Sequence, residues 1–166
     1  MRLLRRWKDL TPADRRLLAR SLLLLWVLNA VLLVAHYRKV YPRVKRLAAL
    51  RRGRRQAEPG QAATRVRWAV GVVASYTPWR LSCLCQAMAG LVLASELGLD
   101  ASLRIGIKRG DLFEGHAWLE ADTGVMLGEV DDLNQFVLLA LNDEPRISHP
   151  APLSGPDGVA DHYDRR

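Results

Sequence analysis

Apolar residues recur at helical spacing along the first half of the chain. The longest such stretch spans residues 17–35, and Thr11 followed by Pro12 predicts the start of its helix. Threonine is a good N-cap, and proline is well tolerated at the first helical position. The same spacing predicts two more helices, over 37–50 and 61–76.

The first apolar helix allows two interpretations. A membrane span needs about 20 predominantly apolar residues, and residues 17–35 are interrupted by Arg20, Ser21 and Asn29. We therefore expect a helix that packs on the rest of the protein, on a partner or on a membrane surface, rather than one that crosses a membrane.

The second half of the chain predicts one helix followed by strands. Apolar positions between Ser82 and Leu97 recur every 3.6 residues, and Gly98 supplies a stop. Strands are expected at 101–107, 114–121 and 125–130, the last two forming a hairpin. Residues 132–141 suggest a short helix or an irregular apolar segment, and the tail after 142 suggests flexibility. This order predicts an α+β fold.

Charge divides the chain into a basic arm and an acidic part. Residues 1–67 hold 18 Lys/Arg and three acids, whereas residues 68–166 hold 7 Lys/Arg and 14 acids. We predict a helical extension and linker at 1–60, a globular domain at 61–141 and a tail at 142–166. The arginines at 51–55 lack interleaved aromatic residues, so we interpret them as a solvated linker and expect no nucleic-acid partner.

Both cysteines lie at the start of the fourth predicted helix. Cys83 falls in its first turn, where unpaired N–H groups and the helix dipole favour a thiolate. Cys85 is rotated by about 200° from it, so we interpret Cys85 as a buried apolar residue. Their spacing disfavours a disulfide and suggests a reducing, cytoplasmic compartment. No zinc-ligand or phosphate-loop pattern is present, and we expect no metal and no cofactor.

A histidine in a strand is the natural partner for such a thiol. His116 alternates with Ala117 and therefore faces away from the apolar side of its strand. If the hairpin turns at residues 123–124, Asp131 lies directly opposite His116 and Glu129 lies diagonally from it. Either acid could then orient the ring, and a slip of one residue would remove both.

These motifs together resemble the leader peptidases of lasso-peptide biosynthesis, known as transglutaminase-like B proteins. The resemblance covers about residues 65–140 and rests on Pro78-Trp79-Arg80, Cys83-Leu84-x-Gln86-Ala87, Gly115-His116-Ala117-Trp118-Leu119-Glu120 and Leu127-Gly128-Glu129. It implies a transglutaminase/papain-like α+β fold with a catalytic triad. Cys83 matches the family's nucleophile and His116 its base. Glu129 occupies the position of the family's aspartate, and Asp131 matches a second common acid.

The resemblance also implies an activity and partners. The expected function is a cysteine peptidase that removes the leader from a precursor peptide, with Trp79 and Trp118 as our candidates for substrate contact. The expected partners are the precursor peptide, a separate small leader-recognition protein and a lasso cyclase. Two alternatives remain open. One is a non-catalytic or membrane-associated scaffold that contacts a membrane surface through residues 17–35, and the other is an acyl transferase with the same fold.

Overall fold

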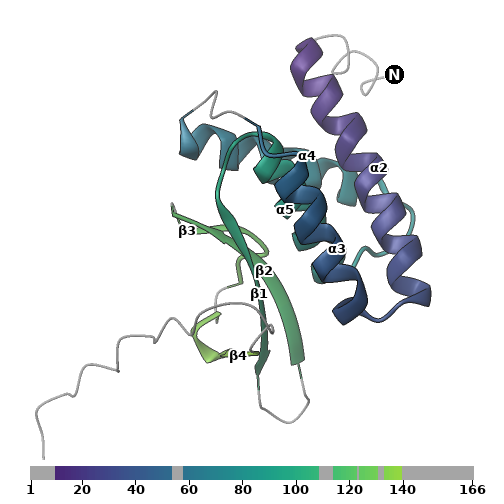
Figure 1. The fold of residues 1–166 in the computed structure, drawn as a ribbon, viewed down its shortest axis with the longest axis vertical. Coiled ribbons are helices and arrows are strands. Elements are labelled where there is room, and N and C mark those ends of the chain that lie inside the picture. Colours follow the sequence, from purple (N-terminus) through teal and green to yellow (C-terminus); the bar gives the residue numbers. More distant parts are fainter. Residues whose placement is uncertain (1–9, 54–57, 109–113, 123, 131–132, 140–166) are drawn as a thin grey trace, which may run out of the picture.

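Four helices precede a four-stranded antiparallel sheet in the computed structural model, which confirms the predicted α+β class (Figure 1). The structure describes residues 10–53, 58–108, 114–122, 124–130 and 133–139. The elements, in chain order, are α2 (Pro12–Val34), α3 (Tyr37–Leu50), α4 (Pro59–Tyr76), α5 (Cys83–Glu96), β1 (Ala101–Lys108), β2 (Glu114–Ala121), β3 (Gly124–Leu127), a 3-10 turn η1 (Leu133–Gln135) and β4 (Val137–Leu138).

Side-chain caps fix where α2 and α5 begin. The Thr11 hydroxyl accepts a hydrogen bond from the Asp14 backbone N–H at 3.1 Å, as the sequence predicts. The Ser82 hydroxyl accepts one from the Cys85 N–H at 3.2 Å, which makes Ser82 the cap and Cys83 the first helical residue. Each cap satisfies one of the N–H groups that a helix start leaves unpaired.

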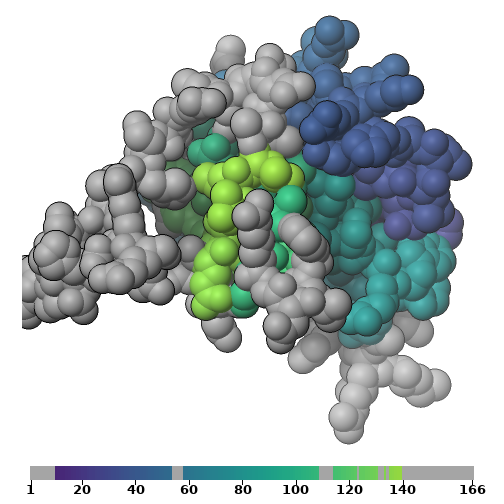
Figure 2. Space-filling model, turned by 90° about the horizontal axis from the view of Figure 1, so that it is seen from below, coloured from purple at the N-terminus to yellow at the C-terminus, as the bar shows by residue number. Residues whose placement is uncertain are grey.

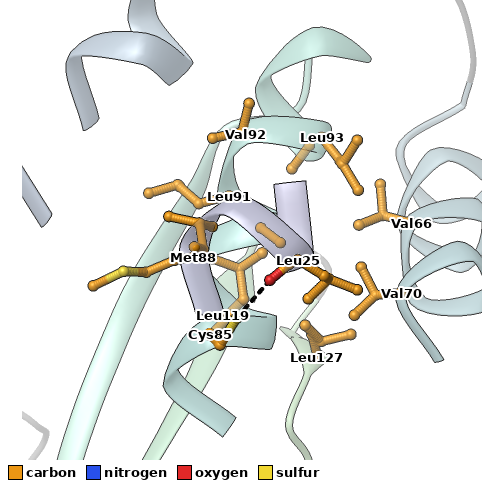
Figure 3. Close-up of a cluster of buried hydrophobic side chains, with 14 of the residues drawn as sticks. Leu25, Val66, Val70, Cys85, Met88, Leu91, Val92, Leu93, Leu119 and Leu127 are labelled. Carbon is orange, nitrogen blue, oxygen red and sulfur yellow. Dashed lines mark hydrogen bonds between the residues drawn. The ribbon is translucent and has the colours of Figure 1, made fainter. Parts of the chain in front are cut away.

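Helix α5 lies at the centre of the protein. Ten of its fourteen residues are buried, and α2, α3, α4, β1 and β2 all pack against it. A helix that is apolar on every side is stable only when other elements cover it all round. Figure 3 shows part of this core, in which Met88 and Leu93 of α5 meet Leu25 of α2 and Val70 of α4.

Polar contacts hold the C-terminal end of α5 to the two N-terminal helices. The Glu96 carboxylate, largely buried, accepts hydrogen bonds from Arg20 at 2.9 Å and Arg51 at 3.3 Å. The Ser95 hydroxyl donates to the Ala48 carbonyl at 2.6 Å. Helices α2 and α3 are thus packed into the same core as the rest of the protein. The predicted domain boundaries at residues 60 and 141 stay predictions.

One side of α2 is packed and the other is not. Leu17, Leu18, Ser21, Leu25 and Leu28 are buried against the core. The opposite side is exposed although it is apolar, and by length and composition alone α2 could cross a membrane.

The sheet has the order β3-β2-β1-β4, and its β2–β3 register differs from the predicted one. Leu119 pairs with Leu127 and Glu120 with Val125, because a bulge lies between Leu119 and Glu120. The expected turn at residues 123–124 would pair residue 120 with 127, and that prediction is therefore wrong. The expected pairing of 116 with 131 involves a residue outside the described ones. The third strand also ends at Leu127 rather than at 130, because the next residue, Gly128, has a φ of +80°.

The sheet buries residues on both faces. Leu103 of β1 and Ala117 and Leu119 of β2 belong to the core shared with the helices. Trp118 points to the other face, where Phe136 packs near it at a centroid distance of 6.3 Å. Phe136 precedes β4, which pairs with β1 at Gly106 and Ile107. Figure 2 shows the β4 segment in yellow-green near the middle of the view, with the blue and purple N-terminal helices to its right.

The segment at 132–141 therefore resolves into a 3-10 turn and a short strand, where the sequence suggested a short helix or an irregular segment. Residues 132, 140 and 141 of that segment, and the tail from 142, lie outside the described residues.

Gly106 is the tightest point of this second face, and we predict that Gly106→Ala destabilises the protein. A Cβ there would lie 2.8 Å from the Phe136 Cβ and 3.0 Å from the Trp118 ring. Such overpacking costs about 1–3 kcal/mol, measurable as a lower midpoint in urea denaturation. The matched control is Gly71→Ala in α4, where a Cβ meets nothing within 4 Å. Alanine should there stabilise the helix by about 0.5–1 kcal/mol. Equal effects of the two changes would contradict the packing described.

Candidate active site

Cys83 is the first residue of α5 and is partly exposed. Its position follows from the sequence, because the Ser82 cap starts the helix and the apolar residues of α5 fix the face that is buried. A thiol in the first helical turn lies close to unpaired N–H groups and to the positive end of the helix dipole. Both effects favour the thiolate, which is the nucleophilic form of cysteine.

Cys85 has the opposite character. Its side chain is completely buried, and its sulfur lies 3.5 Å from the Leu25 carbonyl oxygen, as the dashed line in Figure 3 shows. Burial raises the pKa of the Cys85 thiol to about 12, because the thiolate would lose its hydration. Cys85 is therefore a packing residue that stays protonated at neutral pH, as the helix geometry predicted.

His116 lies near the start of β2 with its ring held in place. The ring Nε2 is 2.7 Å from the Gly128 carbonyl oxygen. A carbonyl can only accept, so Nε2 carries the proton, and the neutral ring keeps a basic lone pair on Nδ1. The ring is also stacked on Trp118, with 6.1 Å between the ring centroids, and lies near Phe136, with 5.7 Å between the centroids.

Gly128 supplies this hydrogen-bond acceptor through its backbone. A Cβ at Gly128 would lie 2.9 Å from the Ala117 carbonyl oxygen, and the φ of +80° is one that side-chain-bearing residues rarely adopt. The Gly128 carbonyl was not among the predicted site groups, because the sequence suggested a carboxylate as the partner of the ring. The signal was the glycine itself, inside the third predicted strand at 125–130.

Of the two predicted acids, the structure describes Glu129 alone, and Glu129 pairs with a group other than the ring. Glu129 is exposed, and its carboxylate is 3.2 Å from the guanidinium of Arg67. Arg67 lies on α4 and also donates to the carbonyls of Val125 and Met126, at 2.9 Å each. Glu129 is thus directed towards α4 rather than towards His116. Asp131 lies outside the described residues.

The two tryptophans differ in what they offer a ligand. Trp79 is 39% exposed and packs edge-on against Trp26 at a centroid distance of 5.1 Å. Trp118 is only 3% exposed, and its indole N–H donates to Glu120 at 2.8 Å. This burial corrects the expected substrate contact at Trp118, because its ring supports His116 from within the protein instead.

Chain direction brings Cys83 and His116 towards the same end of the protein. Helix α5 packs on β1 after a short connection, and β1 pairs antiparallel with β2. Helix α5 and β2 therefore run in similar directions, and Cys83 and His116 both lie near their starts (Figure 1). No hydrogen bond joins the two side chains in the described structure. The His116 ring lies on the face of Trp118 and Phe136, not on the Ala117 face that meets α5.

Comparison with known families decides the relationship. Residues 24–140, which run from within α2 to just beyond β4, match the family described as Transglutaminase-like superfamily. This chain belongs to the transglutaminase-like superfamily. Searches of curated proteins and of solved structures found no match. Enzymes of the transglutaminase-like superfamily usually use a cysteine and a histidine, which suggests hydrolase or transferase chemistry. The match does not extend to a particular substrate.

This transglutaminase-like domain shows no set of metal ligands in the part of the chain that the structure describes. The reactive groups of the candidate site are a thiol, an imidazole and backbone N–H groups, and together they suit acyl transfer.

We predict that the two thiols differ sharply in reactivity. In the native protein at pH 7–8, iodoacetamide should modify Cys83 and leave Cys85 unmodified, because Cys85 is buried and has a pKa of about 12. In denaturant both should react. Peptide mapping by mass spectrometry distinguishes the two sites. Equal labelling of both thiols in the native protein would contradict the structural assignment.

Proposed function

We propose that this protein is a cysteine peptidase that removes the leader from a lasso-peptide precursor. The observation that carries the proposal is the contrast between the two thiols. Cys83 is accessible at a helix start, whereas Cys85 is buried and protonated. A histidine whose tautomer is fixed, near the start of β2, supplies the second group that thiol-dependent acyl transfer needs.

In the proposed reaction, the Cys83 thiolate attacks the carbonyl carbon at the leader–core junction, and a C–S bond forms. Nδ1 of His116 takes the proton of the Cys83 thiol as the thiolate forms, and this imidazolium then protonates the leaving amine nitrogen as the C–N bond breaks. Water then attacks the thioester, releases the leader carboxylate and regenerates the thiol. Nδ1 is the ring nitrogen left for this task, because Nε2 is engaged with Gly128.

Backbone groups of α5 suit the oxyanion of the intermediate. The Ser82 hydroxyl accepts from the Cys85 N–H, and the Ser82 carbonyl accepts from the Gln86 N–H. The N–H groups of Cys83 and Leu84 precede these bonds in the first helical turn. Donors of this kind, aimed at the developing negative charge, stabilise acyl-transfer intermediates strongly.

The reaction requires the ring and the sulfur to approach one another when the peptide binds. Catalytic hydrogen bonds are often longer in a substrate-free enzyme and shorten in the complex. The proposed partners are the precursor peptide, a separate leader-recognition protein and a lasso cyclase that uses the released core. Support for these partners comes from the motif pattern around Cys83 and His116.

The decisive test follows leader release by mass spectrometry, with precursor and leader-recognition protein present. We expect Cys83→Ala to lower the rate by more than about 1,000-fold, because the nucleophile is lost. Cys85→Ala is the matched control and should retain activity, with a stability cost of about 1 kcal/mol for the small cavity it leaves. Full activity of Cys83→Ala would overturn the proposal. A product joined to an added amine would instead identify the acyl transferase.

A second prediction concerns Glu129. Since its partner is Arg67 rather than His116, Glu129→Gln should change the cleavage rate by less than about threefold and the unfolding free energy by less than about 1 kcal/mol. His116→Gln is the comparison and should lose most activity. A large loss for Glu129→Gln would mean that this carboxylate orients the ring during the reaction.

A further inference from the structure

The exposed side of α2 is unusual for a protein surface, because nearly all of it is apolar. Between positions 19 and 34 the exposed residues recur at helical spacing and, apart from Arg20, none is charged. The large apolar members, between 36% and 88% exposed, are Leu22, Leu23, Trp26, Val27, Val31, Leu33 and Val34. This apolar stripe extends for about 22 Å along the helix. Exposed apolar surface of this extent marks an interaction site.

Positive charge is concentrated in the N-terminal helices that include the apolar stripe. Residues 10–53 carry ten Lys/Arg and one acid, Asp14. Helix α3 lies beside α2 (Figure 1), and its exposed residues include Arg38, Lys39, Arg43, Lys45 and Arg46. None of these five forms an ion pair with an acid in the described structure. The helix beside α2 thus carries exposed cations that have no ion-pair partner among the described residues.

Packing shows that α2 cannot cross a bilayer in this fold. Its other side is buried against α4 and α5, where Leu25 meets Cys85 and Arg20 pairs with Glu96. A crossing would expose that core and break the Arg20–Glu96 pair. A second copy of the chain fits poorly, since it would bring two strongly basic surfaces together.

The geometry points to the surface of an anionic bilayer as the partner of the α2 stripe. We infer that α2 lies in the plane of the membrane, with its apolar stripe among the acyl chains and the α3 cations on the lipid phosphates. Apolar burial and attraction to anionic lipid together drive such interfacial binding. Trp26 contacts Trp79, which precedes Cys83 by four residues, so docking would hold the start of α5 close to the membrane.

The test is flotation of the full-length protein with vesicles of phosphatidylcholine alone or mixed with phosphatidylglycerol, without precursor peptide. We expect binding to the mixed vesicles, weakened by high salt. Leu23→Asp/Val27→Asp should lower the partition coefficient about tenfold or more, and Lys45→Glu/Arg46→Glu should lower it for the anionic vesicles. Val137→Asp, an equally exposed apolar position on β4, is the matched control and should bind normally.

Three results would overturn the inference. One is equal binding by the wild type and the α2 double variant when circular dichroism shows both to be folded. Another is a concentration-dependent dimer in sedimentation that this variant abolishes, since that would make a second copy the partner. The third is resistance to carbonate extraction, which would indicate a membrane span. The flotation experiment does not depend on leader cleavage. Its outcome therefore tests membrane binding even if the peptidase proposal fails.

Discussion

Burial of α5 is the constraint on which the rest of this structure depends. The helix is apolar on every side, and it is stable only because three helices and a sheet cover it. That requirement explains why residues of α2 and α3 belong to the same core. It also explains why Glu96 at the end of α5 forms ion pairs with two arginines, Arg20 and Arg51, since its carboxylate is largely buried.

The same burial separates the chemistry of the two cysteines. A helix surrounded on all sides leaves only its start accessible, and Cys83 stands there while Cys85, two residues later, is turned into the core. The sheet contributes in a comparable way. It buries Trp118 and Phe136 on its second face, and these rings hold His116 near the start of β2. Core packing thus places the Cys83 thiol and the His116 imidazole near the starts of their elements in this transglutaminase-like domain.

Much of this arrangement could be predicted from local sequence patterns, and the errors have a common origin. The helices could be predicted from the 3.6-residue spacing and from residues such as Thr11 and Ser82 at their starts. Caps and periodicity are local, because each acts over a few residues. The hairpin register failed because a bulge at Leu119–Glu120 and the turn at Gly128 change the pairing by one to two residues. Pairing between strands depends on such backbone details, which side-chain alternation does not encode. The burial of Trp118 was missed because Phe136, which is distant in the sequence, packs on that face.

The hydrogen bond from His116 to the Gly128 carbonyl has a consequence for variation in this protein. A main-chain acceptor is present whatever side chains surround it, so we expect substitutions at position 129 to leave the ring orientation intact. Alanine scanning of polar residues would overlook the acceptor altogether. What must be retained is the local path of the chain, and glycine at 128 is the residue that permits it. The tolerance of the neighbouring acid and the intolerance of the glycine are therefore two effects of one bond.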